Sequence, residues 1–106
     1  MRRDVFQAIA DPTRRAILVL LSAQAMTPNS LALHFRTSRQ AISKHLRVLS
    51  ECALILPRPE GREIHYSLEW ARMKEIDVWI EQFRQHWDTR FTQLDHLLDT
   101  LKPPVT

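Results

Sequence analysis

Glycine and cysteine each occur only once in the 106 residues, at Gly61 and Cys52. A single cysteine excludes an internal disulfide framework and fits a reducing compartment. A single glycine leaves no glycine-rich loop that could cradle a phosphate. No apolar run approaches the roughly 18 residues that a membrane span needs, and no charged-then-apolar leader opens the chain. We therefore expect a cytoplasmic protein that does not use a membrane.

Acidic residues are sparse in the first two thirds of the chain. Residues 1–68 hold ten Lys/Arg against five Asp/Glu, a net charge of +5, whereas residues 69–106 hold five against seven, a net charge of −2. Positive charge gathered in one part of a chain indicates an electrostatic footprint for an anionic partner rather than general solubility. The first part is therefore the candidate for nucleic-acid binding.

The stretch 37–49 in that part predicts an amphipathic helix. Ile42, Leu46 and Leu49 recur at helical spacing and share one face, and Ser38 suits the N-cap position. The opposite face has no acidic residue before Glu51. Its side chains are Arg39, Gln40, Ser43, Lys44 and Arg47. Such a face favours an anionic partner, although a solvated basic helix would show the same pattern.

A second, shorter predicted helix precedes this one. Thr27 can cap it, and Pro28 suits its first position. Residues 36–37 then leave only a tight connection before Ser38. Two short helices joined so closely predict a helix-turn-helix, in which the second helix reads the major groove.

The pattern after this motif changes to the alternation of a β-hairpin. Residues 54–56 predict a strand, 58–62 a turn and 63–68 a returning strand, with Gly61 supplying the backbone angles that a hairpin turn needs. Arg58 and Arg62 flank its tip, so we expect a wing that holds DNA phosphates or the minor groove. The predicted fold class is mainly α with a small β-hairpin wing, a winged helix-turn-helix.

Three blocks of the sequence, residues 10–18, 38–49 and 61–68, resemble the ArsR-type bacterial winged-helix repressors. The resemblance is close over residues 4 to about 68 and looser in the C-terminal part. It implies a homodimer that binds double-stranded DNA at an inverted-repeat operator and represses transcription. Together with the helix pattern, it implies these DNA-binding residues: Ser38, Arg39, Gln40, Ser43, Lys44, His45, Arg47, Arg58 and Arg62.

The chain departs from that family at several positions. Thr27 and Asn29 stand where its metal sensors carry a Cys-x-Cys pair, and Trp79 stands where a second family metal site would need histidine. We therefore expect no metal site. Arg36 and Ala53 replace two usual glycines, so either position can carry a strained backbone or a differently closed turn.

The N-terminal residues predict two helices. Residues 3–10 place Val5, Phe6 and Ile9 on one side, and a second helix over about 12–23 begins at the cap Asp11 and Pro12. We expect Arg14 and Arg15 at its start to be exposed to solvent, with their stems packed on neighbours.

A long helix is predicted from Glu69 to about Leu101, because no glycine or proline interrupts it. Its apolar residues form a heptad-like seam that carries more apolar surface than its own small domain can cover. The helix either folds back on its own domain or pairs with a second copy, and we favour the pair. The predicted dimer interface is Val5, Phe6, Ile9, Ile80, Phe83, Trp87, Phe91, Leu94 and Leu98.

The length predicts a single domain, residues 1–106, with a DNA-binding part at about 1–68 and a dimerisation helix at about 69–102. No pattern of catalytic residues is present, and we expect neither enzymatic activity nor a cofactor. Two alternatives stay open. The winged helix could serve protein interaction without DNA, and the aromatic C-terminal helices could enclose an apolar small-molecule effector.

Overall fold

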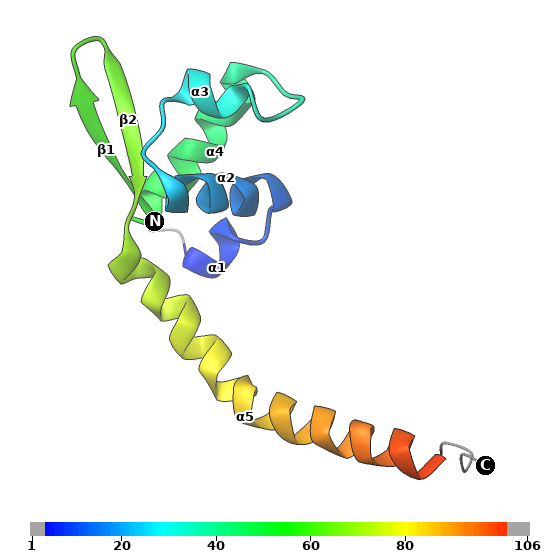
Figure 1. The fold of residues 1–106 in the computed structure, drawn as a ribbon. Coiled ribbons are helices and arrows are strands. Elements are labelled where there is room, and N and C mark those ends of the chain that lie inside the picture. The colour runs from blue at the N-terminus through cyan, green and yellow to red at the C-terminus, as the bar shows by residue number, and fades with distance from the viewer. Residues whose placement is uncertain (1–3, 102–106) are drawn as a thin grey trace. The chain divides into compact units, whose positions relative to one another are not determined.

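Helices and one hairpin make up the computed structural model, which describes residues 4–101 (Figure 1). The elements are α1 Val5–Ala8, α2 Pro12–Ala23, α3 Pro28–Ala32, α4 Arg39–Glu51, β1 Ile55–Glu60, β2 Glu63–Leu68 and α5 Trp70–Leu101. The predicted fold class, mainly α with a hairpin and a long C-terminal helix, is confirmed. The chain divides into two compact units, Met1–Lys74 and Glu75–Thr106.

Side-chain caps set where the two main helices of the first unit begin. The Asp11 carboxylate accepts a hydrogen bond from the backbone N–H of Arg14 at 3.0 Å, and Pro12 follows at the first helical position. The Ser38 hydroxyl accepts from the N–H of Ala41 at 3.1 Å at the start of α4. Each oxygen satisfies a backbone donor that the helix itself leaves without a partner. Both predicted caps are confirmed.

The core of the first unit is built from the apolar faces of its helices and the base of the hairpin. α4 contributes the three residues that the sequence pattern predicted, and each is almost fully buried. Packing these faces removes apolar surface from water and is the main favourable contribution to folding. The largest fully buried side chains are Val5, Ile17, Leu31, Ile42, Leu46, Leu49, Cys52, Leu54 and Ile55.

Two predicted boundaries in the helical part were wrong. α1 spans only Val5–Ala8, within the predicted 3–10, of which residue 3 lies outside the described residues. α3 ends at Ala32, so residues 33–37 form a longer connection than the predicted two-residue one. The chain leaves α3 through tight turns in which His34 and Phe35 donate to carbonyls three residues back. Leu31 is the one fully buried anchor of this short helix.

The hairpin is longer than predicted. β1 continues to Glu60, and only Gly61 and Arg62 form the turn, with Gly61 at a φ of 63°. Pro57 lies opposite Tyr66 in the antiparallel register. Tyr66 exchanges backbone hydrogen bonds of 2.8 and 3.0 Å with Met26, so its polar backbone groups face away from β1. Hydrogen-bonded and non-hydrogen-bonded residue pairs alternate along an antiparallel ladder, and the pair of Pro57 and Tyr66 is of the second kind. Pro59, two residues further on, is in the same kind of pair, so both proline nitrogens lie on the outer edge of β1.

The end of α4 carries the strained backbone that the missing glycine predicted. Ala53 has a φ of 58°, the one non-glycine residue with a positive φ in the described range 4–101. Leu54 donates to the Leu49 carbonyl at 3.1 Å, which closes the helix with the six-residue loop of a Schellman motif. Arg36, where the family's other glycine is missing, has no positive φ. Its turn is closed differently.

The second unit consists of α5 from Glu75 onward. Its seam is rich in aromatic side chains, and Trp79 and Phe83 contact each other edge to face with ring centres 5.0 Å apart. On its charged side, Arg84 bonds to Glu81 at 2.7 Å and to Asp77 at 3.1 Å. A single helix has no second element within its own unit to cover its apolar seam.

Candidate nucleic-acid interface

The exposed face of α4 is a shallow groove lined entirely by polar and basic side chains. Ile42 and Leu46 turn inward to the core, so helical periodicity turns the groove residues outward. The structure gives these side chains no ion pair within residues 4–101. Their nitrogen donors are therefore available to an external partner. The groove residues are Arg39, Gln40, Ser43, Lys44 and Arg47, all predicted from the sequence.

Ser38 stands at the end of this groove but has a structural task. Its hydroxyl oxygen accepts the backbone bond that caps α4. The same hydroxyl keeps its proton for donation. Ser38 thus fixes the start of α4, the second helix of the helix-turn-helix, which is called the reader helix below. Any bond from Ser38 to a phosphate would use the remaining O–H.

A second groove joins α3, α4 and the wing. Arg39 from α4 and Arg62 from the hairpin turn both line it, although the rest of α4 and the whole of β1 lie between them in the sequence. Asn29, in the first turn of α3, adds an exposed amide that the sequence analysis did not assign to DNA. The carboxylate of Glu63 also lies here. Asn29 could have been found from its place in the first turn of the helix that precedes the reader.

The wing places its two arginines differently. Arg62 is in the turn beside the second groove. Arg58 lies within β1 opposite His65, is 69% exposed, and has a weak ion pair of 3.9 Å with Glu60. His65 Nε2 lies 3.3 Å from Glu60 and 3.7 Å from Glu63. The carboxylates of Glu60 and Glu63 therefore offset part of the positive charge near Arg58. The ion pair between Arg58 and Glu60 is long and exposed, so Arg58 can readily leave it.

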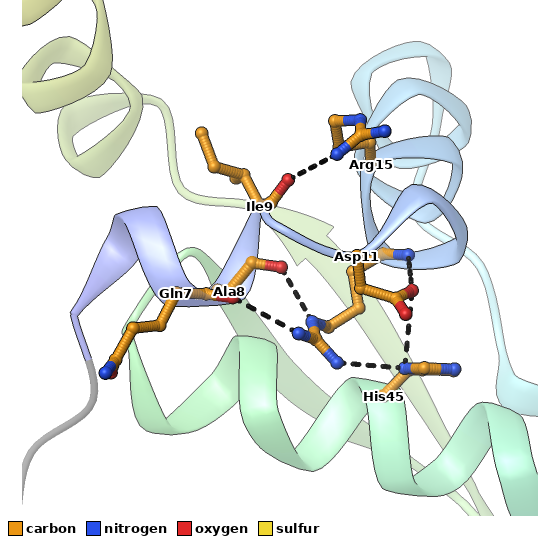
Figure 2. Close-up of polar contacts among 7 residues, drawn as sticks. Gln7, Ala8, Ile9, Asp11, Arg15 and His45 are labelled. Atoms are coloured by element: carbon orange, nitrogen blue, oxygen red, sulfur yellow. Dashed lines mark hydrogen bonds and ion pairs between the residues drawn. The ribbon is translucent and has the colours of Figure 1, made fainter.

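His45 does not lie with the groove residues. Its side chain is only 23% exposed and faces the start of α2, where its Nδ1 is 3.3 Å from a guanidinium nitrogen of Arg14 and 3.9 Å from Asp11 (Figure 2). In this structure His45 contacts the start of α2, and its predicted DNA-backbone role stays a prediction. Its position on the helix borders the buried face.

Arg15 is exposed, as predicted, whereas Arg14 is half-buried and differs from the expectation of a solvent-exposed charge. Arg14 donates to the carbonyls of Ala8 at 2.6 Å and Gln7 at 3.2 Å, while Arg15 donates to the carbonyl of Ile9 at 2.8 Å (Figure 2). These carbonyls lie at the end of α1, where a helix leaves its last acceptors without a partner. The two arginines therefore supply hydrogen-bond donors to the carbonyls at the end of α1.

The electrostatics at the start of α2 follow from the same contacts. The backbone N–H of Arg14 that bonds to Asp11 holds the pKa of this carboxyl below its ordinary value. The nearby charge of Arg14 acts in the same direction, and burial acts in the opposite one. Asp11 is therefore ionised throughout the physiological range.

The predicted dimer residues of the first unit fall into two groups. Val5 is only 1% exposed, so it packs in its own core and has almost no surface to offer a partner. Phe6 and Ile9 are half-buried. Val5 is thus corrected to a core residue, because the short α1 turns one side inward.

In the second unit, the predicted seam residues retain large exposed surfaces. Phe83 is 41% exposed, Trp87 54% and Phe91 61%. Leu94 and Leu98 are about half exposed, and Ile80 is half-buried. So much neighbouring aromatic and aliphatic surface is typical of an interaction site.

No group of three or more His, Cys, Asp or Glu side chains in the described range 4–101 could hold a metal ion. None of the helices in that range is both long and apolar enough to cross a membrane.

Known proteins resemble this chain in sequence. A family model described as a helix-turn-helix domain matches residues 9–57. The transcriptional repressor SdpR of Bacillus subtilis is 40% identical over 80 residues, which are 76% of this chain and 89% of that protein. The HTH-type transcriptional regulator Rv2034 of Mycobacterium tuberculosis is 33% identical over 95 residues, 90% of this chain and 86% of that protein.

Solved structures give the same result. An ArsR-like transcriptional regulator from Rhodococcus sp. RHA1 superposes with a TM-score of 0.70 at 34% identity, covering 92% of this chain and 90% of that one. Such agreement over most of both chains includes the helix-turn-helix, the wing and the order of elements. The chain thus belongs to the ArsR family of winged helix-turn-helix, DNA-binding transcriptional regulators, which is not a class of enzymes.

Proposed function

We propose that the protein is a cytoplasmic, homodimeric repressor that binds an inverted-repeat operator. The observation that carries the proposal is the outward face of α4, which holds five donor side chains and no acid. A face of this kind has no evident use in a module that binds only proteins. SdpR, the relative described above, is named a transcriptional repressor.

Within the reader helix, two residues are proposed to read bases. Gln40 can form two hydrogen bonds with adenine, and Arg39 two with guanine, in the major groove. Ser43 can serve either base. These contacts would set the sequence of each half-site.

A second group is proposed to hold the DNA backbone. Lys44 and Arg47 on α4, with Arg58 and Arg62 on the wing, contribute positive charge that neutralises phosphates without reading sequence. Asn29 joins this group, because it shares a groove with Arg39 and Arg62. These residues would set affinity and its salt dependence.

The dimer is proposed to form through the exposed seam of α5, with Phe6 of α1 and Ile9 at its C-cap adding to the contact. Residues up to about 68 then act as the DNA-binding part, and the helix from about residue 69 acts as the dimerisation helix. A two-fold dimer presents two reader helices, and its half-sites lie about 34–36 Å apart, one turn of DNA.

The test is selection of bound duplexes from a random pool at two salt concentrations, followed by sequencing. The expected result is an inverted repeat with half-sites about one helical turn apart. Salt-sensitive binding without a consensus would contradict sequence-specific repression. Absence of binding at both salt concentrations would favour a protein-interaction module instead.

A further inference from the structure

A cluster of polar contacts connects α1, α2 and α4 behind the reader face, and Arg14 is at its centre (Figure 2). Each nitrogen of its guanidinium has an acceptor. Nε donates to the Ala8 carbonyl at 2.6 Å and one terminal nitrogen to the Gln7 carbonyl at 3.2 Å, both at the end of α1. The other terminal nitrogen lies 3.3 Å from His45 Nδ1 on α4.

The backbone of Arg14 is fixed as well. Its N–H bonds to the Asp11 carboxylate that caps α2. The guanidinium is a rigid planar fork, so two bonds to α1 determine where its third nitrogen points. That nitrogen meets His45, a half-buried side chain of α4.

We propose that Arg14 is a positioning residue that sets the orientation of the reader helix through His45. The link is the 3.3 Å contact between the guanidinium, which can only donate, and His45 Nδ1, which serves as its acceptor. Neither residue needs to touch DNA. His45 stands one position after Lys44 and two before Arg47, so a displacement of the helix backbone at His45 carries both groove residues with it.

Arg15 provides a matched control. It is the next residue of α2, carries the same charge and donates to the α1 carbonyl of Ile9 at 2.8 Å. Its described bonds do not reach α4. Arg14→Gln removes one positive charge, two bonds to the end of α1 and the link to His45, whereas Arg15→Gln removes one positive charge and a single bond to Ile9. His45→Ala removes the link alone and leaves the two bonds from Arg14 to α1 in place.

The DNA readout of this inference rests on the proposed function. The probes are the highest-ranked duplex from the random-pool selection and a scrambled duplex of equal composition, each titrated with wild-type and variant dimers. We expect Arg14→Gln and His45→Ala to weaken binding to the selected duplex about tenfold more than Arg15→Gln does, the size of a contact coupling. Binding to the scrambled duplex should fall equally in Arg14→Gln and Arg15→Gln.

Two further variants separate positioning from direct contact. The double variant Arg14→Gln, His45→Ala should lose no more than the worse single variant, because both remove one link. His45→Asn should retain most of the affinity, since its amide oxygen can replace Nδ1 as acceptor. Losses that multiply in the double variant, or equal affinity in Arg14→Gln and Arg15→Gln, would overturn the inference.

A measurement without DNA keeps the inference testable if the selection yields no consensus. Backbone amide NMR shifts of the free protein should change along residues 39–47 in Arg14→Gln and His45→Ala, and stay near wild type in Arg15→Gln. Unchanged shifts in α4 for the two former variants would refute positioning. A selection without consensus would instead refute the proposed function.

Discussion

At the scale of single residues, Ala53 holds a backbone conformation that an L side chain adopts at a cost. A left-handed residue with a Cβ costs roughly 1–2 kcal/mol, and glycine removes that cost while losing about 0.5–1 kcal/mol of chain entropy. Ala53→Gly should therefore raise the free energy of unfolding by about 0.5–1 kcal/mol. Urea unfolding at a fixed protein concentration measures the change.

Arg36→Gly is the control for this prediction. Arg36 also stands where the family has glycine, but its φ is not positive. The substitution should give no stabilisation, because glycine only adds freedom to the unfolded chain there. Equal stabilisation by both variants would show that the φ of Ala53 is not the cause.

Asp11 gives a prediction about pH. Because its pKa is lowered in the folded state, the unfolded chain binds more protons and stability rises with pH in that range. The contribution is complete above the ordinary pKa of about 3.9 and is lost as the pH falls through the lowered value. Asp11→Asn keeps a good cap but removes the titration. Its unfolding free energy should fall less steeply below pH 4 than that of wild type.

The residue scale also shows what local sequence can and cannot predict. Ser38 and Asp11 were recognised as caps because each bond spans three residues. Arg14 was taken for a solvent-exposed charge, since its acceptors belong to α1 and to α4, thirty-one residues away. The contact between His45 and Arg14 was not predicted for the same reason. The helix position of His45 borders both faces, and the local sequence does not show that its side chain packs against α2.

At the scale of elements, the reader helix and the wing should respond differently to substitution. Gln40→Ala removes a bidentate base contact and should cost about 1–3 kcal/mol at its cognate base pair, with little effect on unrelated duplexes. Equal weakening of selected and scrambled duplexes would contradict the base-reading role.

Arg62→Ala should weaken binding to every duplex and reduce the slope of log affinity against log salt by about 1. Titrations at several salt concentrations measure that slope. Glu63→Gln in the same groove is the opposite control, because it removes a repulsive charge and should strengthen binding.

The existence and type of every element followed from the sequence pattern, while several boundaries did not. α2 and α5 were predicted to within about one residue, because a cap with proline marks the start of α2 and no glycine or proline interrupts α5. β1 was predicted too short, since Pro57 and Pro59 look like the end of a strand. An edge strand tolerates proline where its nitrogen faces outward, and that position depends on the register with β2.

At the scale of the whole molecule, the exposed seam of α5 predicts the assembly. Phe83→Asp together with Trp87→Asp introduces two charges where the proposed dimer buries aromatic rings, so the variant should be monomeric at micromolar concentration and fail to bind the operator. Sedimentation velocity measures the oligomeric state. A double variant that remains dimeric would refute the seam as the interface.

Val78→Asp with Gln85→Asp is the matched control for that variant. Both positions lie on the polar side of the same helix, near Asp77 and Glu81. The added charge is equal, so the dimer should survive if the seam forms the contact. Loss of the dimer in both variants would indicate a general effect of negative charge on α5.

The proline pair in β1 has a consequence for behaviour at high concentration. A two-stranded sheet has two open edges, and an open edge can add a strand from another molecule and start aggregation. On the outer edge of β1, Pro57 and Pro59 have no N–H to donate, while Met26 occupies part of the edge of β2. The wing is thereby protected from edge-to-edge polymerisation, and it can remain extended and solvent-exposed for DNA without becoming a template for fibrils.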